Sequence, residues 1–158
     1  MSIENVKEYL SGFGLDERIM EFNESSATVA EAAHALGCKE MEIAKTMSFM
    51  VDGAPIIIVM AGDAKTDNGK FKGLFHTKAV MLKFEEVLPL LGHPVGGVCP
   101  FALPEGVPVY LDESLRRFEV IYPAAGTPSS AVRLTPAELE KASKAKGWID
   151  VCRGWQEE

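Results

Sequence analysis

The sequence predicts a single mixed α/β domain, and three observations lead to this fold class. Short segments with a strand pattern alternate with short helical segments along the chain. One pair of apolar runs flanks Asp52-Gly53, a dipeptide that favours the type I′ turn of a tight β-hairpin. The 158 residues contain no repeat, low-complexity segment or linker, so we expect one domain over 1–158. The strands are too short and irregular for a doubly wound nucleotide-binding sheet.

In the first half of the chain, helices are expected on both sides of this hairpin. Thr28 or Ser26 can cap the second helix, and Gly37 can end it. The second hairpin strand is apolar throughout its middle, as is typical of a strand buried on both faces. In chain order we expect a helix over 2–12, a strand over 18–24, a helix over 28–37, hairpin strands over 42–51 and 54–62, and a helix over 67–75.

The second half is expected to continue the alternation. Thr135, Pro136 and Glu138 form a capping box with proline at the first helical position, a strong signal for a helix start. Pro89 is tolerable only near the first turn of its helix, which leaves the start of that helix open. We expect a strand over 78–84, a helix over 85–92, strands over 107–112 and 117–124 joined by a helical turn from Asp112, a strand over 130–134, a helix over 135–147 and an edge strand over 148–152.

Composition narrows the classes of function. The net charge of −7 argues against broad, non-specific binding of nucleic acid, and no DNA partner is expected. The charge is uneven, because 1–42 holds nine acidic and three basic residues while 64–84 holds five lysines and one aspartate. A solvated lysine-rich face and a small phosphate-binding patch both fit this pattern.

The sequence also indicates where the protein works and what it lacks. No apolar run approaches the ~20 residues of a membrane span, and the N-terminus lacks the features of a signal peptide. We therefore expect a cytoplasmic protein with no membrane partner. Three scattered cysteines without metal-ligand spacing argue against a disulfide framework and a zinc site, so no metal or cofactor is expected.

Lys45 is a candidate binding residue because of the strand on which it lies. Under strand alternation it shares a face with Ile43, Met47 and Phe49, which are all apolar. A lysine on such a face must reach solvent, pair with an acid or serve a pocket. Its side chain either extends to water at the edge of the sheet or forms a cation in a cleft that binds phosphate or carboxylate.

The segment 92–104, GHPVGGVCPFALP, combines three glycines and three prolines. This composition predicts a loop of one defined shape whose main chain approaches something closely. The backbone amides of Gly96, Gly97 and Val98 are candidates to hold an oxyanion or a polar ligand group. Cys99 with His93 as its base is a weaker alternative, because most such cysteines are small apolar fillers.

A second stretch of small residues covers 123–134. Gly126, Ser129 and Ser130 either line a narrow pocket or form a turn into the next strand, and the turn is the better interpretation of the segment alone.

These motifs together, in their order, resemble the YbaK-like family of prolyl-tRNA editing domains. The resemblance rests on EIAKTMSFMVDGAPIIIVMAGD, GHPVGGVCPFALP, VPVYLDESLRRF and YPAAGTPSSAVRLTPAEL, and it runs from about residue 20 to 145. It implies a mixed, barrel-like sheet surrounded by short helices. It also implies a free-standing deacylase that hydrolyses the ester of mischarged tRNA, usually tRNA(Pro), in a substrate-assisted reaction.

The resemblance further implies roles for individual residues. Lys45 matches the family's signature lysine and, with Gly97 and Val98, would form the catalytic site. Substrate-binding positions would be Gly96, Cys99, Pro100, Gly126, Ser129 and Ser130. The implied partners are the acceptor end of aminoacyl-tRNA and prolyl-tRNA synthetase, and Lys70, Lys72 or Lys78 would contact the tRNA.

Two departures from the family pattern lie where the amino-acid pocket is expected. Ala102 stands where the loop of the family commonly has glycine, and the segment 129–132 lacks an aspartate that some members carry. The identity of the amino acid therefore stays open. A non-catalytic module that binds tRNA or a nucleotide and a thiol hydrolase using Cys99 remain as alternatives.

Overall fold

The fold is organised around the long hairpin of β2 (Ile43–Val51) and β3 (Ala54–Ala61), in a computed structural model that describes residues 2–155. Asp52 and Gly53 join the strands with φ values of 52° and 81°, so both turn residues are left-handed, as a type I′ turn requires. The two strands pair in antiparallel register, with Lys45 opposite Met60. The predicted hairpin is thus confirmed.

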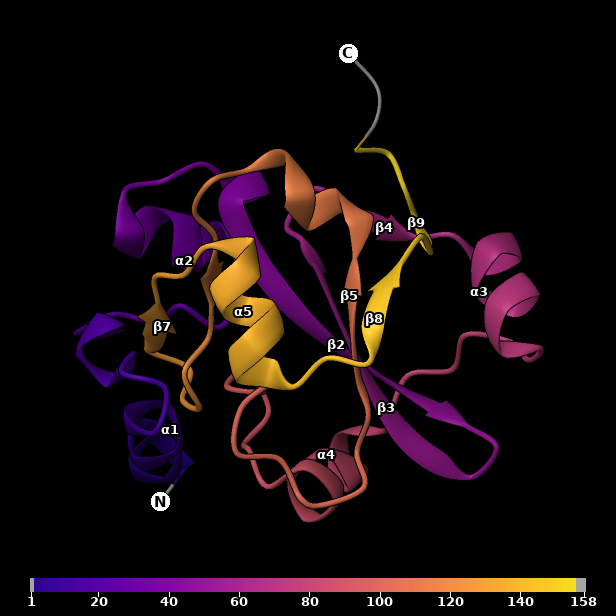
Figure 1. Ribbon diagram of the computed structural model, residues 1–158, viewed down its shortest axis with the longest axis horizontal. Coiled ribbons are helices and arrows are strands. Elements are labelled where there is room, and N and C mark those ends of the chain that lie inside the picture. The colour runs from indigo at the N-terminus through magenta and orange to yellow at the C-terminus, as the bar shows by residue number, and fades with distance from the viewer. Residues whose placement is uncertain (1, 156–158) are drawn as a thin grey trace.

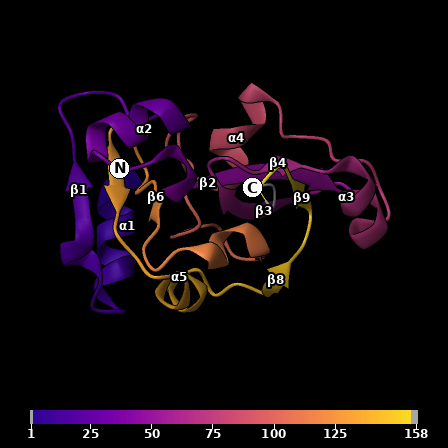
Figure 2. The same cartoon turned by 90° about the horizontal axis from the view of Figure 1, so that it is seen from above.

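Three further strands extend the hairpin into a curled five-stranded half-barrel with the order β6-β2-β3-β5-β8 (β5 is labelled in Figure 1 and β6 in Figure 2). These are β5 (Val109–Asp112), β6 (Tyr122–Pro123) and β8 (Gly147–Ile149), and each pairs in parallel with its neighbour in the sheet. Two small antiparallel sheets join β1 (Ile19–Glu21) to β7 (Ser130–Val132) and β4 (Lys65–Thr66) to β9 (Cys152–Arg153). The mixed, barrel-like sheet that was predicted is confirmed.

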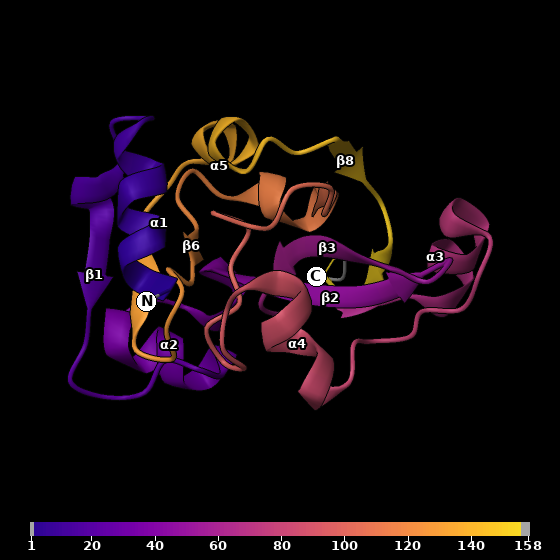
Figure 3. The same ribbon diagram turned by 90° about the horizontal axis from the view of Figure 1, so that it is seen from below.

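Short helices surround this sheet, and their ends follow local capping rules. They are α1 (Ser2–Ser11), α2 (Val29–Leu36), α3 (Asn68–Phe75), α4 (Phe84–Leu91) and α5 (Pro136–Ser143), with a 3₁₀ turn at Glu113–Arg117. Thr135 makes the predicted capping box, Thr28 rather than Ser26 caps α2 and also forms a capping box, and Gly37 ends α2 in the left-handed conformation. Helices α4 and α5 lie on opposite sides of the hairpin, α1 and α2 at one end of the molecule and α3 at the other (Figures 2 and 3).

The core lies against both faces of β3. Ile57, Ile58, Val59 and Met60 are fully buried although successive side chains point to opposite faces, which confirms the expectation for this strand. Burial of each such side chain contributes about 1.5–3 kcal/mol of transfer free energy. Among the described residues, no helix has the length and apolar character needed to cross a membrane.

Several elements differ from the sequence prediction. The strand expected over 117–124 is reduced to the two residues of β6, and the helix expected over 135–147 ends at Ser143. The strand expected over 78–84 is wrong, because this segment makes only a single bridge to β2, between Phe49 and Met81. The side chain of Met81 is 53% exposed, so the segment has little burial to hold a longer ladder in place. Helix α4 begins at Phe84, which puts Pro89 in its second turn rather than its first.

Candidate functional site

A cleft of about 340 Å³ opens along the outer edge of β2. Its walls come from α2, from the end of β6, from the start of β7, from α4 and from the glycine- and proline-containing loop 92–104. Figure 3 shows α2, β6, β2 and α4 around this region. Residues from 27 to 131 therefore meet here, although they are far apart along the chain.

Lys45 lies in this cleft, as the pocket interpretation of its strand required. The side chain is half-buried, and its Nζ donates to the carbonyl oxygen of Ala64 over 2.6 Å. Burial lowers the pKa of Lys45 from its ordinary value, and the nearby Cys152 and Asp63 offset only part of that effect. The ammonium group thus donates to a carbonyl and forms no salt bridge with a described carboxylate.

The loop 92–104 is pinned against two other segments. Gly96 is left-handed with a φ of 89°, and a Cβ on it would lie 3.2 Å from the Cβ of Ala27. A Cβ on Gly97 would lie 2.7–2.8 Å from three backbone atoms of Thr127, closer than side chains tolerate. The close approach that the glycines predicted is thus, at Gly97, an approach to the protein's own backbone. Gly96 and Val98 line the cleft, whereas Gly97 does not. The N–H of Gly97 donates to Pro94 O over 2.9 Å, so this amide is not free to hold a ligand group as predicted.

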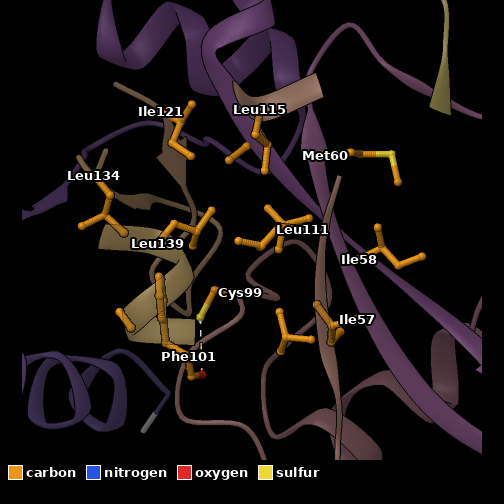
Figure 4. Close-up of a cluster of buried hydrophobic side chains, with 14 of the residues drawn as sticks. Ile57, Ile58, Met60, Cys99, Phe101, Leu111, Leu115, Ile121, Leu134 and Leu139 are labelled. Atoms are coloured by element: carbon orange, nitrogen blue, oxygen red, sulfur yellow. Dashed lines mark hydrogen bonds between the residues drawn. The ribbon is translucent and has the colours of Figure 1, made fainter. Parts of the chain in front are cut away.

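The thiol of Cys99 belongs to the core and does not line the cleft (Figure 4). Its Sγ donates to the carbonyl of Phe101 and lies 3.5 Å from Nε2 of His93. Burial raises the pKa of Cys99 to about 12 and lowers the pKa of His93, so the pair stays neutral and closed to solvent. The fold brings these two residues together, but the geometry speaks against a thiol nucleophile. The prediction that the Cys99 side chain contacts the substrate is therefore wrong, because this side chain is buried in the core and lies outside the cleft.

The other small-residue positions divide between the cleft and its support. Ser130 lines the cleft, and its Oγ lies 2.9 Å from Oγ1 of Thr127, which donates to it. Gly126, with a φ of 100°, and Ser129 lie outside the lining and form the turn into β7, as the turn interpretation required. Pro100 is also outside this lining and lies at a separate hollow with Ala102.

A comparison with known protein families identifies the chain. The model of the aminoacyl-tRNA editing domain matches residues 23–142. The chain belongs to this family. The editing domain is 46% identical over 157 residues to YwhH, an uncharacterized protein of Bacillus subtilis, and the match covers 99% of this chain and all of YwhH. It is 32% identical over 100 residues to the proline–tRNA ligase of Leuconostoc citreum, where the match covers 63% of this chain and 17% of the ligase.

Solved structures show the same fold for the whole editing domain. A "putative trans-editing enzyme for prolyl tRNA synthetase" superposes with a TM-score of 0.87 at 30% sequence identity, covering 97% of this chain and 98% of that one. The hypothetical protein APE2540 superposes with a TM-score of 0.84 at 32% identity, covering 94% and 99%. These matches confirm the family resemblance and the fold class predicted from the sequence.

Sequence reasoning missed an important wall of this editing-domain cleft. Helix α2 contributes Val29 and Ala32, its N-cap contributes Thr28, and β6 contributes Tyr122. The sequence of α2 is that of an ordinary capped amphipathic helix, so no local signal set it apart. Lys70, Lys72 and Lys78, expected near the pocket, do not line the cleft, and Lys70 is engaged with Asp150 over 3.0 Å.

Ala102, one of the two departures from the family pattern, has a φ of 54°. A left-handed conformation suits glycine and costs other residues about 1–2 kcal/mol. At the end of this loop, Ala102 thus adopts a backbone conformation that favours glycine.

Among the residues that the structure describes, no group of three or more metal-ligating side chains lies close enough to hold a metal ion.

Proposed function

We propose that this editing domain hydrolyses the ester bond of mischarged tRNA, with tRNA(Pro) as the carrier, and that it acts in trans on the charged tRNA. The observation that carries the proposal is the composition of the cleft. Lys45 is the one charged side chain among its described lining residues, and the rest of the lining is mainly small and apolar. Such a wall fits a small amino-acid side chain beside an anionic acceptor end.

The lining also indicates how water would be activated. None of the described lining residues supplies a carboxylate, an imidazole or a thiol, the usual general bases. A reaction here would take its base from the substrate, through a free hydroxyl of the terminal ribose. Water then adds to the ester carbonyl, the bond from the carbonyl carbon to the ribose oxygen breaks, and that oxygen takes up the proton that the water gives up.

Lys45 would hold the acceptor end during this reaction. A partly desolvated ammonium group gains more from a phosphate than an exposed lysine does, because the local dielectric is lower. The loop residues Gly96 and Val98 belong to the lining, and their amides donate to no other described backbone group, so these amides would face the ester.

The relatives support the partners in this proposal. The match to a segment of proline–tRNA ligases supports tRNA(Pro) as substrate and prolyl-tRNA synthetase as a partner. The superposition on nearly the whole of a trans-editing candidate supports action in trans. A substrate made for translation makes the cytoplasm the expected place of action.

The test is deacylation of tRNA(Pro) charged in turn with Ala, Cys, Ser, Thr and Pro, by the wild type and by Lys45→Ala. We expect selective hydrolysis of one wrong ester and a loss of about 100-fold or more in Lys45→Ala with the fold preserved. Lys39→Ala is the matched control, since Lys39 is exposed and lies outside the cleft. If every ester survived while charged tRNA still bound, the protein would be a binding module and the proposal would be wrong.

A further inference from the structure

Alternate residues of β2 direct their backbone N–H and C=O groups to the outer edge of the strand, which is the edge away from β3. Ile43 accepts a hydrogen bond from Gly62 N over 2.8 Å, so residues 43, 45 and 47 direct their N–H and C=O groups toward β3. On the other edge, Met50 donates to Val80 O over 2.7 Å, and Ser48 accepts from Leu82 N over 3.3 Å. Thr46 has the same parity as Ser48 and Met50, so its N–H and C=O point away from β3.

The row of backbone hydrogen bonds along this outer edge is interrupted at a single residue. Strand β6 pairs with Ile43 and Ala44, and the segment 80–82 closes the edge again at Ser48. Thr46 lies between them, lines the cleft and has no backbone hydrogen bond on this edge to any described residue. Its buried hydroxyl also lacks a partner among the described residues. An unfilled place in a sheet edge, one residue long, thus faces the cleft.

An α-aminoacyl ester has the groups that fill such a place. In an antiparallel pair, two opposed residues exchange both N–H···O bonds. The amino nitrogen and the carbonyl oxygen of one extended aminoacyl group point to the same side, as they do in a strand residue. Extended ligands bind to free sheet edges by this same exchange.

We propose that the aminoacyl group binds to Thr46 as a strand of one residue. The α-ammonium group donates to the carbonyl of Thr46, and the ester carbonyl accepts from the Thr46 N–H. The second bond aims a fixed donor at the oxygen on which charge develops when water adds. The inference rests on the proposed function and specifies its substrate as an ester of an α-amino acid, recognised by its main-chain atoms.

The first test uses the wild-type protein and two stable analogues. One is 3′-alanylamino-3′-deoxyadenosine, and the other is its propanoyl counterpart, which lacks the amine. In the free protein, we expect the Thr46 amide to exchange with solvent about 100-fold faster than the amides of Lys45 and Met47, which bond to β3. Saturation with the alanyl analogue is expected to slow that exchange at least about tenfold, and the propanoyl analogue is expected to bind about tenfold more weakly. Equal affinity of the two analogues, or unchanged exchange at Thr46, would overturn the inference.

Two variants test the same contact independently. Thr46→Pro removes the N–H, and because that group is outside the ladder a proline can be accommodated at this edge. It is expected to weaken binding of the alanyl analogue about tenfold or more, whereas Thr46→Val, which keeps the backbone groups, retains the preference for the amine. If Thr46→Pro does not fold, the exchange measurement decides alone.

The outcomes separate this inference from the proposed function. Thr46 protection by the alanyl analogue without hydrolysis of any charged tRNA would leave the binding mode standing and remove the deacylase. Hydrolysis without any effect of the amine would remove only the role of Thr46.

Discussion

Cys99 is a fully buried thiol that donates to the carbonyl of Phe101, and serine can make the same bond. We therefore expect Cys99→Ser to keep deacylation within about twofold of the wild type, with a modest loss of stability of about 1–2 kcal/mol from burying a more polar atom. Deacylation assays and thermal unfolding check this. Iodoacetamide is expected to leave Cys99 of the native protein unmodified, since its pKa is raised to about 12. A loss of several orders of magnitude in the deacylation rate of Cys99→Ser would instead support the thiol mechanism.

Ala102 holds a left-handed conformation without the freedom of glycine. Ala102→Gly removes the steric cost of about 1–2 kcal/mol but adds disorder to the unfolded chain, which takes back about 0.5–1 kcal/mol. The net expectation is a stability equal to the wild type or up to about 1.5 kcal/mol higher, measured by urea denaturation. Ala137→Gly, at an exposed position of α5, is the control and should lose about 1 kcal/mol. Equal losses in the two variants would refute the interpretation of Ala102.

Individual site residues differ in how far the sequence could predict them. Lys45 stood out because a cation in an apolar strand is costly unless something uses it. Thr46 could not stand out, because its free main-chain groups depend on where β6 stops and where the segment 80–82 resumes the ladder. The sequence of β2 contains neither fact.

The loop 92–104 is held in position because Gly97 packs directly on the backbone of Thr127. A methyl group there would overlap three main-chain atoms, so Gly97→Ala is expected to cost about 1–3 kcal/mol and to displace the loop from the cleft. Both stability and deacylation should fall, as measured by denaturant unfolding and by the rate on charged tRNA.

The matched control for that variant is Gly73→Ala in helix α3. No atom lies within 4 Å of the added Cβ, and alanine favours a helix over glycine by about 1 kcal/mol. Gly73→Ala is expected to be more stable than the wild type with an unchanged rate. A Gly97→Ala protein as stable and active as the wild type would show that the loop does not rest on Thr127.

Elements with local signals were predictable, and those held by tertiary contacts were not. The cap at Thr28, the capping box at Thr135 and the turn at Asp52-Gly53 each depend on residues only a few positions apart, so the sequence reveals them. The segment 78–84 has the composition of a strand, yet its pairing with β2 is limited to one bridge. Pairing depends on a partner edge that no short window of sequence displays.

At the scale of the whole molecule, a net charge of −7 coexists with lysines outside the cleft that form no ion pair within the described part of the chain. Lys72 and Lys78 border a hollow of about 390 Å³ beside α3 and make no ion pair with any described carboxylate. If these lysines contact the acceptor end, binding of tRNA weakens with salt in proportion to the phosphates that they neutralise. Each contact to a single strand contributes a slope of about −0.7 in log K against log salt.

Lys78→Gln is therefore expected to make this salt slope shallower by about 0.7 and to weaken tRNA binding at low salt. Lys7→Gln serves as the control, since Lys7 pairs with Glu21 over 2.8 Å and lies on α1 at the other end of the molecule. Fluorescence titrations of labelled tRNA at several salt concentrations provide the measurement. Equal slopes for the two variants would place the tRNA on another surface.

The small β1–β7 sheet has a consequence for the order in which the protein assembles. It joins residues 19–21 to residues 130–132, and Ser130 and Ala131 at this junction border the cleft. Contacts between such distant parts of a chain form slowly, because the long intervening loop must close first. In refolding experiments, capture of the alanyl analogue should lag behind the fluorescence change of Trp148 and Trp155. The ability to bind substrate would then be the last property that the folding chain acquires.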